Sequence, residues 1–292
     1  MRVFAPLDPL SARGVLCCLP GGSYDWHYWH LDVPGHAGYS FAEHFASLGY
    51  VVVAVDHLGI GQSSTADGLR LAHLARGDAA VVSDIRSRVS TGTLLAKLPR
   101  LDVPFIGVGH SMGACLTVMV QVEARCYDAV VLLGYSAAVD NVFDIDTAAG
   151  ALEERIITSA AGVRALCGAA ADAEVAMIDR NLVRGLFYAE DVPEPVIAAD
   201  TAVQACTPIY ASAEAAAPGY ATEYIESVDV PVFLGFGDGV DLSPDPRTET
   251  ANYRSASDLT LFILTGSSHC HNFSVPRPRL WERIASWLAA FG

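Results

Sequence analysis

Short apolar runs alternate along the chain with segments in which apolar residues recur at helical spacing. Because strands buried on both faces are apolar along their length, the short runs predict strands, whereas a one-sided apolar stripe predicts a helix. The expected strands are residues 14–19, 50–56, 129–133, 230–235 and 259–264, and the expected helices include residues 40–48 and 114–124. This alternation predicts an α/β fold with a mostly parallel central sheet flanked by helices.

Local signals indicate where two of the helices begin or end. Ser40 followed by Glu43 is a capping box at the start of the helix over residues 40–48, and Gly49 is its stop signal. Asp78 is expected to cap a longer helix that leads toward a strand ending at Ser111. The apolar positions of that longer helix are Val81, Val82, Ile85 and Val89.

The composition changes between residues 139 and 225. This segment is alanine-rich and favours helix, and it is interrupted by the proline-containing residues 191–195. Strand signals disappear there, so we expect a helical insertion, with the α/β core formed by residues 1–138 and 226–292. The chain closes with a predicted helix over residues 280–291, whose apolar stripe suits packing on the sheet: Leu280, Ile284, Trp287 and Leu288.

Composition bounds the class of protein. The 292 residues, 52% of them hydrophobic, suffice for one large domain or for one domain with an insertion. A net charge of −15 argues against partners that need a cationic footprint, so neither nucleic-acid nor membrane binding is expected. We expect neither a signal peptide nor a membrane span, because residues 1–6 contain no long apolar run and no uncharged apolar segment reaches about 18 residues. The seven scattered cysteines favour reduced thiols in a cytoplasmic protein, and a homodimer is left open.

Ser111 is the first candidate for chemistry. It lies between Gly109 and Gly113, after the apolar residues 103–106 and before the predicted helix over residues 114–124. This pattern is typical of a nucleophile elbow, where a strand turns sharply into a helix and neighbouring side chains must be small. Because a serine hydroxyl is a poor nucleophile, acyl transfer also requires a histidine and an acid that orients it.

Three further features accompany the elbow. Gly21-Gly22 follows the first strong strand, residues 56–63 read Asp-x-x-Gly-x-Gly-x-Ser, and Asp and His residues follow the last two expected strands. With these motifs in this order, the sequence resembles the α/β-hydrolase superfamily over essentially the whole chain. In that family a His-Gly segment usually follows the first strong strand, and here Pro20 stands where histidine is common. The resemblance implies the α/β-hydrolase fold, an inserted helical cap over residues 139–225, and no cofactor.

The family order of nucleophile, acid and histidine directs attention to two late loops. The strand over residues 230–235 runs into a loop with Asp238 and Asp241, and the strand over residues 259–264 runs into a loop with His269 and His271. The resemblance implies a triad of Ser111, His269 and Asp241. Asp238 remains a rival acid, as does Asp140 after the preceding strand; His271 remains a rival histidine, because residues two apart in an extended segment share a face.

The same resemblance implies an oxyanion hole made by the backbone N–H of Met112 and that of Gly22 or Ser23. The candidate substrate pocket is formed by Tyr24, Trp26, His110, Phe187 and Tyr188, with Leu186 and Val196 as further wall residues, although aromatic runs also suit core packing.

Other polar residues have weaker interpretations. Arg180 and Arg184 could hold a substrate carboxylate or form a solvated helix face. His27 and His30 with the two late histidines do not match a known metal-site spacing, so no metal is expected.

The resulting hypothesis is a serine hydrolase that cleaves a small, largely apolar carboxylic ester through an acyl-enzyme. A small-molecule ester is then the expected partner. The alternatives on the same triad are a carbon–carbon bond hydrolase and a cofactor-free haloperoxidase-like enzyme. A non-enzymatic binding protein of this fold is the remaining alternative, and the intact triad argues against it. Epoxide hydrolase and dehalogenase chemistry are disfavoured because the elbow carries serine instead of aspartate.

Overall fold

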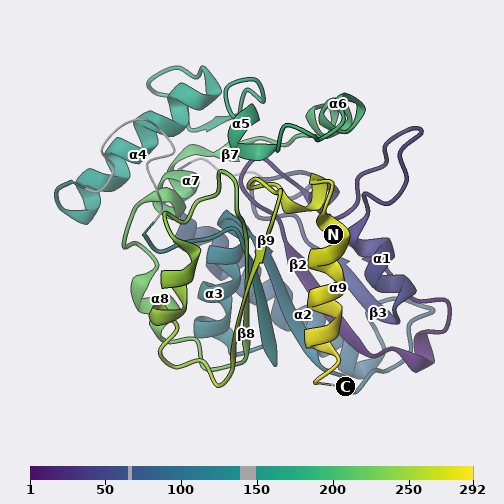
Figure 1. The fold of residues 1–292 in the computed structure, drawn as a ribbon. Helices are drawn as coiled ribbons and strands as arrows, with labels where there is room; N and C mark the ends of the chain where they lie inside the picture. The colour runs from purple at the N-terminus through teal and green to yellow at the C-terminus, as the bar shows by residue number, and fades with distance from the viewer. Residues whose placement is uncertain (65–67, 139–148, 292) are drawn as a thin grey trace.

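The computed structural model describes residues 1–64, 68–138 and 149–291. Its centre is a seven-stranded sheet in the order β1-β3-β2-β4-β5-β8-β9 (Figure 1). Every neighbouring pair is parallel except β1 and β3, which are antiparallel. The strands are β1 (Arg2–Phe4), β2 (Gly14–Leu19), β3 (Tyr50–Ala54), β4 (Phe105–His110), β5 (Ala129–Leu133), β8 (Val232–Gly237) and β9 (Leu259–Leu264). The predicted α/β class with a mostly parallel sheet is confirmed; the short edge strand β1 was not predicted.

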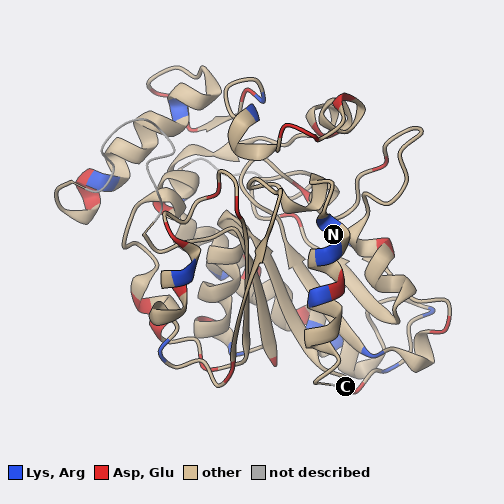
Figure 2. Cartoon of the chain, viewed as in Figure 1, with Lys and Arg blue, Asp and Glu red and all other residues tan. Residues whose placement is uncertain are grey.

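Helices cover both faces of the sheet (Figure 1). One face carries α2 (Leu71–Thr91), α3 (Met112–Ala124) and α8 (Thr222–Glu226), and the other carries α1 (Phe41–Ser47) and α9 (Arg277–Leu288). Within β2, alternate side chains enter opposite cores: Val15, Cys17 and Leu19 face α2 and α3, whereas Leu16 and Cys18 face α1 and α9. Burial on both faces explains why the parallel strands are apolar at successive positions. Figure 2 accordingly shows charged residues mainly on helices and loops.

The helix starts follow the predictions only in part. The backbone N–H of Glu43 donates to Ser40 Oγ at 2.9 Å, so α1 has its serine cap, and Gly49 follows it with a φ of +94°. Asp78, in contrast, lies inside α2 and is buried against His57. The expectation that Asp78 caps this helix is therefore wrong. Among the predicted apolar positions, Val81 is 43% exposed while its neighbour Val82 is fully buried.

The inserted segment lies between β5 and β8. It contains α4 (Leu152–Cys167), β6 (Val175–Ala176), α5 (Arg184–Phe187), α6 (Glu194–Ala202), β7 (Thr207–Pro208), α7 (Ile209–Ala216) and α8. Figure 1 shows α4, α5 and α6 beyond one end of the sheet, whereas α8 lies beside α3. The expected boundary between residues 225 and 226 falls within α8. Within the described ranges, every helix is too short or too polar to cross a membrane.

Candidate active site

Ser111 lies at a sharp turn between β4 and α3. Its backbone has φ 55° and ψ −125°, a conformation that costs energy for a residue with a side chain and is typical of a nucleophile elbow. The elbow packs closely on the end of β2: a Cβ atom on Gly113 would run into the carbonyl oxygens of Leu19 and Pro20. Glycine is therefore required at this position by contact with backbone atoms that cannot move aside.

Asp241 and His269 lie on the loops that follow β8 and β9, where their side chains are in contact. The Nδ1 atom of His269 lies 2.7 Å from Asp241 Oδ1, and both side chains are buried. His271 reaches the same carboxylate, with Nε2 2.9 Å from Asp241 Oδ2. Asp238 instead accepts the backbone N–H of Gly266 at 2.7 Å. The structure thus brings Asp241 to both histidines, and Asp140 lies outside the described residues.

The charge of Asp241 follows from its surroundings. Burial opposes ionisation, but the electrostatic influence of His271 and hydrogen bonds from both imidazoles outweigh it, so the pKa of Asp241 lies far below its ordinary value. His110 behaves oppositely: burial, followed by the potentials of His269 and His271, holds its pKa well below 6.5. Neutral His110 donates from Nε2 to the carbonyl of His269 at 2.9 Å, which helps to fix the backbone of the histidine loop.

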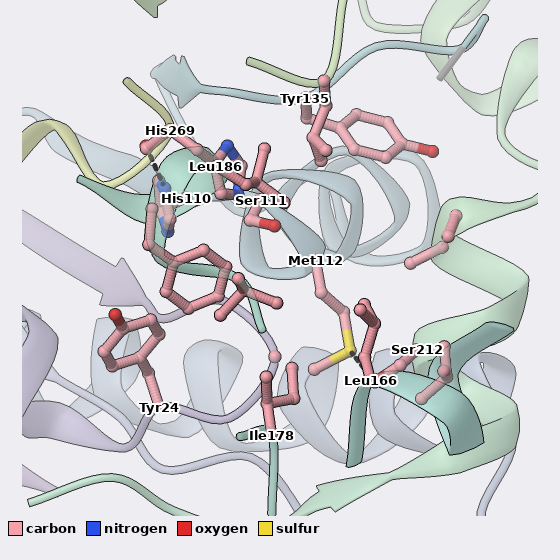
Figure 3. Close-up of a pocket in the computed structure, with 17 residues that line it drawn as sticks. Tyr24, His110, Ser111, Met112, Tyr135, Leu166, Ile178, Leu186, Ser212 and His269 are labelled. Carbon is pink, nitrogen blue, oxygen red and sulfur yellow. Dashed lines mark hydrogen bonds between the residues drawn. The ribbon is translucent and has the colours of Figure 1, made fainter. Parts of the chain in front are cut away.

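A cavity of about 740 Å³, counted out to its opening, connects these groups with the inserted segment. Ser111 and His269 lie at one end, and Ile178 and Leu166 lie at the other (Figure 3). The remaining lining is mostly apolar and comes from both parts of the chain: Gly22, Tyr24, His110, Met112, Tyr135, Val163, Val183, Leu186, Phe187, Ser212, Ala215, Ala216 and Leu242. His271 is fully buried and does not line this cavity.

Three backbone donors of the elbow and of the loop after β2 lack a partner within the described part of the chain. The N–H groups of Met112, Gly22 and Ser23 form no hydrogen bonds with other described residues. Met112 begins α3, where the first N–H groups have no partner within the helix. In residues 1–64, 68–138 and 149–291, His, Cys, Asp and Glu form no group of three that could hold a metal.

Two of the expected pocket residues lie elsewhere. Tyr24, His110 and Phe187 line the cavity, but Trp26 and Tyr188 do not. Trp26 packs against His27 with ring centroids 3.7 Å apart, and the Tyr188 hydroxyl donates to Asp200. Val196, a further expected wall residue, is buried outside the cavity lining. Aromatic composition alone did not distinguish the pocket from the packing behind it.

Arg180 is not part of a solvated helix face, so that interpretation is wrong. Its side chain is 3% exposed, and its Nε lies 3.4 Å from Asp200 Oδ2. One guanidinium nitrogen donates to Ser23 Oγ at 2.7 Å and the other to the Ser23 carbonyl at 3.3 Å. Arg180 precedes α5, whereas Arg184 begins it and pairs with Glu194 at the surface. Arg180 therefore joins the inserted segment to the expected oxyanion loop, outside the cavity lining.

A second buried pair supports the same loop from the core. His57 Nδ1 lies 2.7 Å from Asp78 Oδ2, and its Nε2 lies 2.8 Å from the carbonyl oxygen of Pro20. Although burial disfavours a charge on His57, the carboxylate of Asp78 raises its pKa. Sequence reasoning did not identify His57, although its place in the Asp-x-x-Gly-x-Gly-x-Ser turn was an available signal.

Comparisons with known proteins agree with this architecture. An esterase from Thermogutta terrifontis, with malate bound, is 17% identical, with 99% of this chain and 92% of that chain covered at a TM-score of 0.64. A soluble variant of monoglyceride lipase from Saccharomyces cerevisiae is 14% identical, with 99% and 90% covered at a TM-score of 0.70. A candidate non-heme bromoperoxidase from Mycobacterium tuberculosis is 14% identical, with 96% and 92% covered at 0.61. At these identities the likeness shows the fold alone.

The sequence itself provides the family assignment. A search of curated proteins found no match. The model of the alpha/beta hydrolase family, however, matches residues 7–282, which include the elbow, both late loops and the inserted segment. The resemblance inferred from the motifs is confirmed, and the chain belongs to the alpha/beta hydrolase family.

Proposed function

We propose that this protein is a serine hydrolase that cleaves small, largely apolar carboxylic esters. The observation that carries the proposal is that Ser111 and His269 line one apolar cavity, while the carboxylate of Asp241 accepts a hydrogen bond from Nδ1 of the His269 ring. Family membership and the esterase and lipase structures of the same fold support a hydrolase. The ester specificity rests on the lining of the cavity.

The hydrogen bond to Asp241 defines the role of each histidine nitrogen. Because the ionised carboxylate only accepts, His269 Nδ1 carries a hydrogen and Nε2 is free to take the Ser111 proton. No hydrogen bond between Ser111 and His269 is present within the described part of the chain; such bonds often tighten only in the substrate complex. Ser111 Oγ then bonds to the ester carbonyl carbon, whose π electrons move onto oxygen.

The resulting oxyanion would accept the unpartnered N–H of Met112 and that of Gly22 or Ser23. Collapse of the tetrahedral intermediate breaks the carbon–oxygen bond to the alcohol, which leaves with the proton held by His269. Water then attacks the acyl-enzyme, again with His269 as base, and releases the acid and the free serine hydroxyl.

The inserted segment, residues 139–225, acts in this proposal as a cap that shapes the substrate site. Leu166, Ile178 and Leu186 come from it and line the cavity. Apolar side chains favour burial of an acyl chain or an apolar alcohol, because removing apolar surface from water contributes roughly 25 cal/mol per Å². Among the described residues, the cavity lining contains no Asp, Glu, Lys or Arg that could pair with an ionised acyl chain.

A fluorophosphonate probe tests the nucleophile directly. We expect labelling of the wild type, loss of labelling in Ser111→Ala, and retention in Ser212→Ala, which removes another hydroxyl from the same cavity. Nitrophenyl esters of increasing acyl length should be hydrolysed by the wild type and not by Ser111→Ala. Equal labelling of the wild type and Ser111→Ala would refute the assignment.

The histidine assignment and the reaction class need separate measurements. We expect His269→Ala to abolish acyl transfer; if only His271→Ala did so, the choice of base would be wrong.

Parallel assays with a vinylogous diketone and with acetate plus hydrogen peroxide distinguish ester hydrolysis from carbon–carbon cleavage and perhydrolysis on the same triad.

A further inference from the structure

All the acceptor positions of Asp241 are occupied. Oδ1 accepts from His269 Nδ1 at 2.7 Å and from the backbone N–H of Leu242 at 2.8 Å. Oδ2 accepts from His271 Nε2 at 2.9 Å and from the backbone N–H of Gly237 at 2.8 Å. A carboxylate has about four lone-pair sites, so these donors account for all of them. The orientation of the Asp241 carboxylate is therefore determined by two imidazole rings and two backbone N–H groups.

The hydrogen-bond partners of His271 also define its tautomer. Its Nε2 faces an ionised carboxylate, which can only accept, so Nε2 carries a hydrogen. Its Nδ1 is buried and has no hydrogen-bond partner among the described residues. A hydrogen on Nδ1 would be a buried donor without an acceptor, which costs more than a bare acceptor nitrogen. His271 is thus a neutral ring that donates once, to Asp241.

We propose that His271 is a positioning residue that acts through Asp241: it holds the carboxylate against His269 and reduces the negative charge available to the His269 ring. The inference rests on the proposed serine hydrolase function. It assigns His271 a different role from that of a proton-transferring base, because His271 does not line the cavity that contains Ser111. A close backbone contact supports a fixed geometry, since a Cβ on Gly134 would lie within 3.1 Å of both rings.

Three other titratable groups near Asp241 are neutral in the working range. From β4, His110 faces both rings, at centroid distances of 4.6 Å to His269 and 5.7 Å to His271, and burial is the main cause of its pKa lying well below 6.5. From the 3-10 helix Trp26–Trp29, Tyr28 is buried, and Cys270 is buried in the histidine loop; burial raises the pKa of both well above their ordinary values. Asp241 is therefore the charged group that His269 contacts directly, whereas the Arg180–Asp200 pair lies behind Phe187, whose ring centroid is 6.0 Å from that of His269.

Removing the His271 donor should leave one acceptor position of Asp241 without a hydrogen bond, so that the carboxylate stabilises a positive charge on the His269 ring more strongly. In His271→Leu we expect kcat to fall about tenfold or more, because a loosened carboxylate no longer fixes the ring. The acidic limb of the kcat/KM pH profile should move to higher pH by about 0.5 to 1 unit, because His269 stays protonated to higher pH. KM should change little, since His271 does not contact the cavity.

Two further variants separate hydrogen bonding from packing. His271→Gln retains a side-chain N–H near the position of Nε2 and should restore most of the activity lost in His271→Leu. His73→Leu removes a histidine that is exposed on α2 and accepts from the backbone N–H of Arg70, not from the residues that bind Asp241, and should leave the acidic limb in place. A folded His271→Leu protein whose pH profile and kcat match the wild type would overturn the proposal.

Nitrogen-15 NMR of the histidine-labelled wild type tests the same inference without a variant that might fold poorly and without turnover. We expect the His271 resonances, assigned with His271→Gln, to show hydrogen on Nε2 and none on Nδ1. Hydrogen on Nδ1 would overturn the proposal even in an active enzyme. Absence of esterase activity would instead refute the proposed function, so the two failures are distinguishable.

Discussion

Replacing Arg180 with methionine should damage both stability and catalysis, because this residue links the inserted segment to the oxyanion loop. Methionine keeps an unbranched apolar stem and removes the guanidinium. The guanidinium carbon lies 4.5 Å from the Tyr24 ring centroid and 4.9 Å from that of Phe187, and its nitrogens bind Ser23 and face Asp200. All of these interactions are lost together in Arg180→Met.

The magnitude follows from burial. The Arg180 and Asp200 side chains are 3% and 1% exposed, so solvent screening is minor. Removing one partner of a buried ion pair typically costs about 3–5 kcal/mol, because the remaining charge is left uncompensated. At about 2 °C per kcal/mol for a chain of this size, the melting temperature should fall by roughly 6–10 °C.

The loss of stability in Arg180→Met should also depend on pH. Burial is the main cause of the raised pKa of Asp200, and removing Arg180 takes away the strongest opposing influence. In the variant, folded Asp200 then binds a proton that the unfolded chain has released, so stability falls as pH rises. The difference between wild type and Arg180→Met should therefore be larger at pH 8 than at pH 5.

Thermal unfolding and ester hydrolysis well below the melting temperature provide the assay. Because Ser23 loses the donors that fix its hydroxyl and carbonyl, we expect kcat to fall about tenfold or more with a smaller change in KM. Arg184→Met is the matched control: its ion pair with Glu194 is exposed and should contribute at most about 1 kcal/mol. The reasoning is refuted if Arg180→Met is no less stable than Arg184→Met.

Three further changes probe the core around the site. Protonated His57 beside Asp78 stabilises the fold, because its pKa is raised in the folded protein: this contribution is complete below about pH 6.5 and is lost as pH rises through the folded pKa. In denaturant titrations the free energy of unfolding should therefore fall more between pH 6 and pH 9 in the wild type than in His57→Gln. Parallel pH curves for the two proteins would contradict this. Gly113→Ala should destabilise by about 1–3 kcal/mol or more through its clash with the end of β2, whereas Gly185→Ala, with open space around its Cβ position, should not; equal melting temperatures would exclude the clash. Asp241→Asn should retain the fold and lower kcat by about 10⁴, because the amide favours the wrong tautomer of the histidine; kcat within tenfold of wild type would exclude Asp241 as the orienting acid.

The strands followed closely from sequence pattern, whereas the helix starts did not. β2 and β5 have the predicted bounds, because a strand buried on both faces requires an uninterrupted apolar run. The start of α2 was misplaced at Asp78, a residue type favoured at helix caps. Its actual partner, His57, lies 21 residues earlier in the chain, and local propensity contains no information about such a contact.

The sequence by itself determined the α/β class, the serine at the elbow and the two late loops that carry acids and histidines, because each depends on the local pattern of strands, glycines and turns. Only the tertiary structure decided which acid meets the histidines: Asp238 and Asp241 follow the same strand, and the path of the loop turns only Asp241 toward them. The tertiary structure also decided the environment of Arg180, whose spacing from Arg184 had suggested a solvent-exposed helix face. Burial against Asp200 and Ser23 depends on chain segments that meet only in the folded protein.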